Sequence, residues 1–310
     1  MMMPIIPPVS KEDLEKELTR DKFIRVTNKG QNIIYDFAAV EAPMLMQEVG
    51  RLRELSFRAA GGGTGLEIDI DEYDTAEFPY RQLIVWDPKN KEILGGYRYI
   101  IGNNLSFDAN GVPILATTKM FHFSDKFIKE YLPQTIELGR SFVQPQYQSS
   151  KAGTKGLYAL DNLWDGLGAL VIDNPEIKYF FGKVTMYTHF NRVARDLILS
   201  FMHKYFEDKE KLVFPYEPVK IDFTKDDLKE IFPGPTFVED YKVLVKRVRE
   251  NGENIPPLVN AYMTLSPSMR SFGTAINTHF GDVEETGIII KIDELYKDKT
   301  DRHVLTYSKD

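Results

Sequence analysis

Residues 137–145 read ELGRSFVQP and place two opposite charges three positions apart in a stretch that otherwise looks like a strand. Successive side chains of a regular strand point to opposite faces, so Glu137 and Arg140 would lie on different sides of a sheet. A bulge at Gly139 would add one residue and bring both side chains to one face, because glycine tolerates unusual backbone angles. The stretch therefore predicts a bulged strand with a carboxylate and a guanidinium on the same face.

Helices and antiparallel hairpins surround this strand. Apolar residues at helical spacing predict helices, whereas alternating β-rich runs with turn signals between them predict hairpins. We expect helices at 11–20, 38–60, 157–173, 189–206, 225–232 and 238–250, hairpins at 22–37 and 81–102, and single strands at 135–147, 177–187 and 287–293. This order predicts a mixed α/β (α+β) domain rather than a doubly wound parallel sheet.

Composition sets the domain plan and removes several classes of function. The chain has 310 residues, 43% of them hydrophobic, and we expect one domain over 1–310 with an N-terminal hairpin extension at 1–37 and a helical, proline-rich insertion at about 207–256. It contains no cysteine, which excludes disulfides, thiolate nucleophiles and cysteine-ligated zinc. A net charge of -7 argues against a nucleic-acid partner. Without a signal-peptide pattern or an apolar run of spanning length, we expect a cytoplasmic chain.

Four familiar motifs are absent or weakly supported. GGGTG at residues 61–65 resembles a phosphate loop, but Leu66 replaces the last glycine and no Lys-Ser/Thr pair follows, which favours a loop that ends a helix. No G-x-S-x-G elbow occurs, and the five histidines lack metal-ligand spacing, so we expect no metal site. His203 and Asp208 form an H-x4-D pair of the kind used by glycerolipid acyltransferases, although a surface position is the favoured interpretation.

Four short segments remain, and together they carry a resemblance. They are RELSF at 53–57, DEYD at 71–74, GGYR at 95–98 and ELGR at 137–140. In this order they resemble the N-acyltransferases of the GNAT superfamily that take acyl chains from acyl carrier protein. These are the ornithine-lipid and glycine-lipid type enzymes, some of them named as hemolysins, with acyl-homoserine-lactone synthases as more distant relatives. The resemblance covers about residues 51–206 and resumes at 255–280.

The resemblance implies a fold and a route for the acyl donor. It implies a GNAT-like mixed, mostly antiparallel sheet with flanking helices, whose bulged central strand splays from the strand at 177–187 to admit a pantetheine arm. The helix at 157–173 would then offer its first N–H groups to the phosphate. Lys151, Lys155 and Gly156 would bind the donor or its carrier. QSSKAGTKG departs from the pattern of acyl-CoA users, and the two lysines are either a basic rim for an acidic carrier or solvated loop residues.

The chemistry of amide formation assigns roles to the central strand. An amine that attacks a thioester must lose a proton, and the tetrahedral oxyanion must be stabilised. Glu137 is the candidate general base, acting through a water molecule. Arg140 would hold Glu137 in place or bind the carboxylate of an amino acid. The alternative is that Glu137 and Arg140 form a structural ion pair that stabilises the bulge.

Further candidates for the substrate site lie in the other three segments. Arg53 and Phe57 share one helical face and would either form a lid over the donor entrance or be a buried arginine beside a core phenylalanine, with Arg53 paired to Asp71 or Asp74. We favour the pairing. Asp71 and Asp74 are also candidates to bind the incoming ammonium group, and Arg98 would reach the same centre from its strand.

The resulting expectation is an acyl-carrier-dependent N-acyltransferase. It would move a long saturated or 3-hydroxy chain from the acyl-phosphopantetheine of acyl carrier protein to the α-amine of a small amino acid, with no bound cofactor. The N-acyl amino acid or aminolipid precursor would be an amphiphile, so we also expect peripheral contact with the inner membrane face. Two alternatives are a signal synthase that makes an acylated lactone and a catalytically silent GNAT-like binding module.

Overall fold

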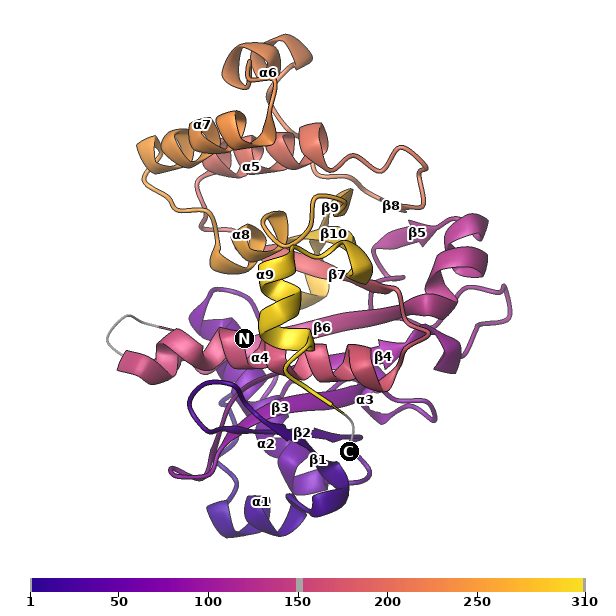
Figure 1. Ribbon diagram of the computed structural model, residues 1–310, viewed down its shortest axis with the longest axis vertical. Coiled ribbons are helices and arrows are strands. Elements are labelled where there is room, and N and C mark those ends of the chain that lie inside the picture. The colour runs from indigo at the N-terminus through magenta and orange to yellow at the C-terminus, as the bar shows by residue number, and fades with distance from the viewer. Residues whose placement is uncertain (1, 149–152, 309–310) are drawn as a thin grey trace.

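An eight-stranded sheet forms the centre of the computed structural model, which describes residues 2–148 and 153–308 (Figure 1). The strand order is β1-β2-β3-β4-β6-β7-β10-β9. Neighbouring strands run antiparallel except for β6 and β7, which are parallel. The strands are β1 (Phe23–Val26), β2 (Ile33–Phe37), β3 (Arg81–Asp87), β4 (Glu92–Ile101), β6 (Thr135–Val143), β7 (Tyr179–Met186), β9 (Arg270–Asn277) and β10 (Val283–Lys291). A separate pair is formed by β5 (Phe121–Phe123) and β8 (Val213–Pro215).

Helices pack on the sheet through apolar stripes that the sequence spacing predicts. The helix α2 (Pro43–Ala59) buries Leu45, Val49 and Leu52 in the same cluster as Trp86 of β3. The helix α4 (Gly153–Asp173) packs its own leucines into a different cluster that contains other residues of β3 and β4. The remaining helices are α1 (Lys11–Glu17), α3 (Glu72–Thr75), α5 (Arg192–Tyr205), α6 (Lys225–Ile231), α7 (Phe237–Glu250), α8 (Pro257–Met263) and α9 (Lys297–Lys299).

This architecture confirms the expected mixed α/β fold with a mostly antiparallel sheet between helices. Both expected hairpins are present, as β1–β2 and β3–β4. The first hairpin is part of the main sheet, because β2 pairs with β3 from Ile33 to Phe37. The strand β9 was not expected, and its polar residues and central glycine explain why the sequence pattern does not reveal it.

The bulge in the central strand is present, but its unusual backbone angle falls on a different residue from the one expected. Gly96 of β4 pairs with Phe142 and Arg98 pairs with Gly139, so β6 contains one extra residue over this interval. Arg140 has a φ of 48°, whereas Gly139 is not among the residues with positive φ. A left-handed conformation costs a residue with a side chain about 1–2 kcal/mol. Ion pairs made by the Arg140 side chain, described below, hold it there.

The two central strands separate where the bulge begins, as the resemblance implies. The parallel pairing of β6 with β7 runs from Thr135 and Tyr179 to Leu138 and Gly182. Beyond that point both strands continue without pairing to each other. Gly182 allows the last close approach, because a Cβ atom at this position would lie 2.6 Å from the carbonyl oxygen of Leu138.

The segment at about 207–256 forms a helical layer at one end of the molecule (Figure 1). The two helices expected there are present as α6 and α7. Leu244 and Val248 of α7 join Phe201 of α5 in one hydrophobic cluster. The two helices thus pack on α5, and the segment also contacts the sheet directly, because Pro218 forms a bridge with Ala275 of β9. No helix in the described part of the chain combines the length and apolar character needed to cross a membrane.

Candidate active site

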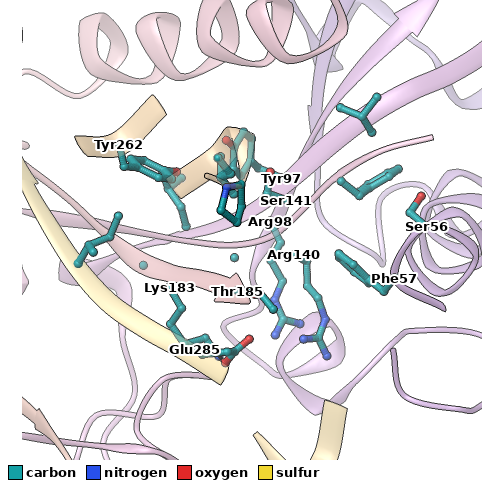
Figure 2. A pocket seen from close by; sticks show the side chains of 18 of the residues that line it. Ser56, Phe57, Tyr97, Arg98, Arg140, Ser141, Lys183, Thr185, Tyr262 and Glu285 are labelled. Atoms are coloured by element: carbon teal, nitrogen blue, oxygen red, sulfur yellow. Dashed lines mark ion pairs between the residues drawn. The ribbon is translucent and has the colours of Figure 1, made fainter. Parts of the chain in front are cut away.

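A cavity of about 570 Å³ opens where β6 and β7 separate (Figure 2). Side chains from α2, α8, β6, β7 and β10 line it. Strand register divides the lining into two halves. Phe181 and Lys183 of β7 lie in the polar half with Glu137, and Phe180 lies in the mainly apolar half with Leu138. The extra residue in the bulge shifts the alternation along β6, so that Val143 lies on the same side as Leu138.

Glu137 has the properties of a general base. Its side chain lines the polar half, although the residue is only 2% exposed. Burial raises the pKa of its carboxyl group from 4.5 to about 7, while Lys183 and hydrogen bonds from Tyr80 and Thr117 partly oppose the rise. The Thr117 hydroxyl donates to Oε2 at 3.2 Å. A carboxylate with this pKa can take up a proton near neutral pH, which is the range in which an acid–base catalyst is most effective.

Arg140 lines the same cavity but is not the partner of Glu137. Its Nε lies 2.9 Å from Asp69, and its Nη2 lies 3.5 Å from Asp71. Its guanidinium group also lies 4.2 Å from the ring centre of Phe280. Both Glu137 and Arg140 belong to the described residues, and they form no ion pair with each other. The alternative of a structural bridge between them is therefore wrong, and the expected orienting of Glu137 by Arg140 is not observed.

A buried network of ion pairs lies next to the polar half of the cavity. Arg53 is fully buried and pairs with Asp74 at 3.2 Å, as the favoured interpretation expects. Arg98 pairs with Asp71 at 2.7 Å and with Asp74 at 3.1 Å. Burial would raise the pKa of Asp74, but the two arginines hold it far below its ordinary value. Asp71 and Asp74 also form a capping box at the start of α3, which fixes the position of both carboxylates.

The network changes the expected assignment of the substrate-binding residues. Phe57 and Arg98 line the cavity, whereas Arg53, Asp71 and Asp74 do not. Arg53 cannot serve as a lid because no part of it is exposed. A buried arginine that already donates to two or more side-chain acceptors has its charge compensated. Its role is to position those neighbouring side chains.

The residues expected to hold the donor cannot be placed at the site. Lys151 lies outside the described residues. Lys155 and Gly156 fall within α4, but their side chains also lie outside the described part of the structure. Their role in binding the donor or its carrier stays a prediction.

The glycine-rich segment at 61–65 already binds an internal anion. The backbone N–H groups of Thr64 and Gly65 donate to the buried carboxylate of Glu54 at 3.0 Å and 2.8 Å. The Thr64 hydroxyl donates to the same group at 2.7 Å. An incoming phosphate would have to displace this carboxylate, so the structure explains why the motif is not a phosphate loop.

The H-x4-D pair lies away from the cavity. His203 is exposed in the last turn of α5. The carboxylate of Asp208 accepts hydrogen bonds from the backbone of the following turn, including the N–H of Leu212. Neither residue lines the cavity. The surface interpretation holds for His203, whereas the Asp208 side chain is only 5% exposed.

Comparisons with known proteins identify the family of the chain. An acetyltransferase (GNAT) domain model matches residues 52–157. A glycine N(alpha)-acyltransferase of Bacteroides thetaiotaomicron is 62% identical over 99% of this chain and 91% of its own length. A glycine N(alpha)-acyltransferase of Phocaeicola vulgatus is 58% identical over 99% of this chain and 94% of its own length. The chain belongs to this family of GNAT acyltransferases.

Solved structures show more remote likeness to this GNAT acyltransferase. The CoA-dependent acyl-homoserine lactone synthase BjaI, solved with SAM and isopentyl-CoA, has 12% identity and a TM-score of 0.35, with 87% of this chain and 89% of that chain covered. An aminoglycoside acetyltransferase in complex with coenzyme A and kanamycin has 10% identity and a TM-score of 0.25, with 96% and 97% covered. No residue role in this acyltransferase follows from likeness at this level.

The sequence analysis missed four residues of the acyltransferase site. Lys183 of β7 and Glu285 of β10 form an ion pair of 2.6 Å in the polar half (Figure 2). Thr117 and Tyr80 hydrogen-bond to the Glu137 carboxyl group from positions outside the strands and far from it in the sequence. The alternation of side chains along residues 177–187 would indicate Lys183 only if the register of this strand with the central strand were known. Across the described residues, three or more histidine, aspartate or glutamate side chains are nowhere grouped as a metal site requires.

Proposed function

We propose that this acyltransferase moves a long fatty acyl chain from the phosphopantetheine thioester of acyl carrier protein to the α-amine of glycine. The printed names of the two relatives support glycine as the acceptor. The resemblance of the four segments supports the carrier protein and a saturated or 3-hydroxy chain. The product, an N-acylglycine, is an amphiphile or aminolipid precursor. Release of such a product would be favoured by transient contact of the enzyme with a membrane surface.

One observation carries the proposal: Glu137 has a pKa of about 7 and faces a cavity at the point where the central strands separate. The amine nitrogen attacks the thioester carbonyl carbon, a new N–C bond forms, and the C–S bond breaks. Glu137 accepts the ammonium proton through a water molecule, and the carrier thiol leaves with a proton. Backbone N–H groups of the bulge around Arg140 stabilise the oxyanion.

The two halves of the cavity suit the two substrates. The apolar half is lined by Val143, Leu160, Phe180, Leu258 and Ile290, and it fits the donor arm and the acyl chain. The polar half fits a small zwitterion. Arg98, Arg140 and Lys183 are its cations, and Arg140 is the residue to which we assign the acceptor carboxylate.

Mass spectrometry of a pooled reaction tests the proposal. Purified protein is mixed with acyl carrier protein loaded with palmitate or 3-hydroxypalmitate, and the twenty amino acids and ornithine are added together. We expect one new product, an N-acylglycine. A parallel reaction with the same chains on coenzyme A identifies the donor. A different acyl amino acid would correct the acceptor, and a lactone formed only with S-adenosylmethionine would indicate a signal synthase.

Two variants separate catalysis from binding. Glu137→Gln should lower turnover by about a hundredfold or more while donor binding persists. His203→Ala serves as the control, because His203 is exposed and lies outside the cavity. If wild-type protein binds loaded carrier protein and forms no product with any acceptor, the chain is a binding module and the proposal fails.

A further inference from the structure

Three hydroxyl groups interrupt the apolar half of the cavity. Tyr97 comes from β4, Ser141 from the residue after the bulge in β6, and Tyr262 from α8, and all three line the cavity (Figure 2). The other side chains named above for this half are aliphatic or aromatic. Three elements that are remote in sequence thus bring hydroxyls to one place in an apolar wall.

The hydroxyl of Tyr97 is buried and lacks a hydrogen-bond partner among the described residues. Tyr97 itself is only 2% exposed. Burial raises the pKa of Tyr97, and hydrogen-bonding contact with the Ser141 and Tyr262 side chains partly opposes the rise, although neither contact has the geometry of a full hydrogen bond. The three hydroxyls therefore form one group. An unsatisfied buried hydroxyl is costly, and native proteins rarely keep one without a reason.

We infer that Tyr97, with Ser141 and Tyr262, binds a hydrogen-bonding group carried by the acyl donor. This inference rests on the proposed function for the identity of the ligand as a thioester donor. Two parts of such a donor offer the chemistry: the amides of the pantetheine arm and a hydroxyl on the acyl chain near the carbonyl. Either group would give the Tyr97 hydroxyl the partner that it lacks in the structure.

The strand register indicates that the three hydroxyls bind a group of the acyl donor and not the amino acid acceptor. Tyr97 and Ser141 lie on the side of the sheet that contacts α4, whereas Glu137 and Lys183 lie in the polar half. Ser141 also lies in the part of β6 that is no longer paired with β7. A donor that reaches Glu137 through the gap between these strands has to pass the hydroxyl group.

Affinity measurements with Tyr97→Phe test the inference without any need for turnover. The probes are S-decyl-pantetheine, S-(3-hydroxydecyl)-pantetheine and decyl ethyl thioether, none of which can transfer an acyl group. The first two differ only in the chain hydroxyl, and the third lacks the pantetheine arm. We expect Tyr97→Phe to weaken binding by about tenfold for the probes that reach the hydroxyls, the value of one hydrogen bond. Loss with both pantetheine probes identifies the arm amides. Loss with the hydroxylated probe alone identifies the chain hydroxyl.

Tyr99→Phe is the matched control. Tyr99 lies two residues along the same strand on the same face, and its hydroxyl donates to Asp36 at 3.0 Å outside the cavity. It should leave all three affinities unchanged. Tyr97→Phe should also melt no lower than wild type, because it removes a hydroxyl that has no partner. Equal affinity of Tyr97→Phe and wild type for every probe overturns the inference, and this result is independent of whether wild-type protein acylates glycine.

Discussion

Glu137→Gln should change both the stability and the activity of the protein in a pH-dependent way. The carboxyl pKa is about 7 in the folded protein against an ordinary value of 4.5. The folded state therefore holds this proton more tightly than the unfolded chain, so the free energy of unfolding falls as pH rises from about 4.5 to about 7 and is level above that range. Each pKa unit corresponds to about 1.4 kcal/mol, which gives wild-type protein a loss of about 3 kcal/mol across the window.

Glutamine has nearly the same shape as the protonated acid and does not titrate. The variant should match wild type near pH 5 and be more stable by about 3 kcal/mol near pH 8, measured by urea unfolding at both pH values. Its turnover should be lower by about a hundredfold or more, the usual contribution of a general base. Wild-type kcat/KM should rise with pH around pH 7, and the variant should lack this rise.

Thr117→Val provides the matched variant. The Thr117 hydroxyl stabilises the ionised form of Glu137 through its hydrogen bond, and Thr117 does not line the cavity. Loss of this bond should move the rise in kcat/KM to higher pH without removing it. Parallel stability curves for wild type and Glu137→Gln, together with an unchanged rate, would refute the assignment of Glu137 as a buried general base.

Three further substitutions probe the support of the site. Asp74→Asn leaves two buried guanidinium groups without their shared carboxylate, and it should lower the free energy of unfolding by about 3–5 kcal/mol in urea titrations. Gly182→Ala brings a Cβ atom to 2.6 Å from the carbonyl oxygen of Leu138, and the strain at the last paired position of β6 and β7 should cost about 1–3 kcal/mol and raise KM for the donor. Asp208→Asn, like His203→Ala, should leave kcat/KM within twofold of wild type, and a large loss of rate would restore the H-x4-D pair as a catalytic candidate.

Most elements of the fold could be predicted because their signals are local. The apolar spacing in α2, α4, α5 and α7 and the turn between β3 and β4 are properties of adjacent residues. The bulge in β6 could be predicted for the same reason, since two charges three positions apart are inconsistent with a regular strand. The short strands β5 and β8 could not, because each depends on its pairing partner for stability.

The site was only partly predictable, for reasons of electrostatics. The sequence indicates Arg53 and Asp74 as candidates for the site. Whether these charges bind a ligand or each other depends on burial, which is a property of the folded chain. Lys183 and Glu285 meet only because β7 and β10 pair in one particular register.

Neighbouring residues and their order along the chain were enough to predict most of the main elements, the bulged strand with its charged residues, and the family. Each of these features depends only on residues that are adjacent in the chain or on the order of short segments along it. The tertiary structure decided that Glu137 has a pKa near 7, that Arg140 pairs with Asp69, and that the Tyr97 hydroxyl is left without a partner in the cavity wall. These properties depend on distances between segments far apart in the chain and on the exclusion of water, which exist only after folding.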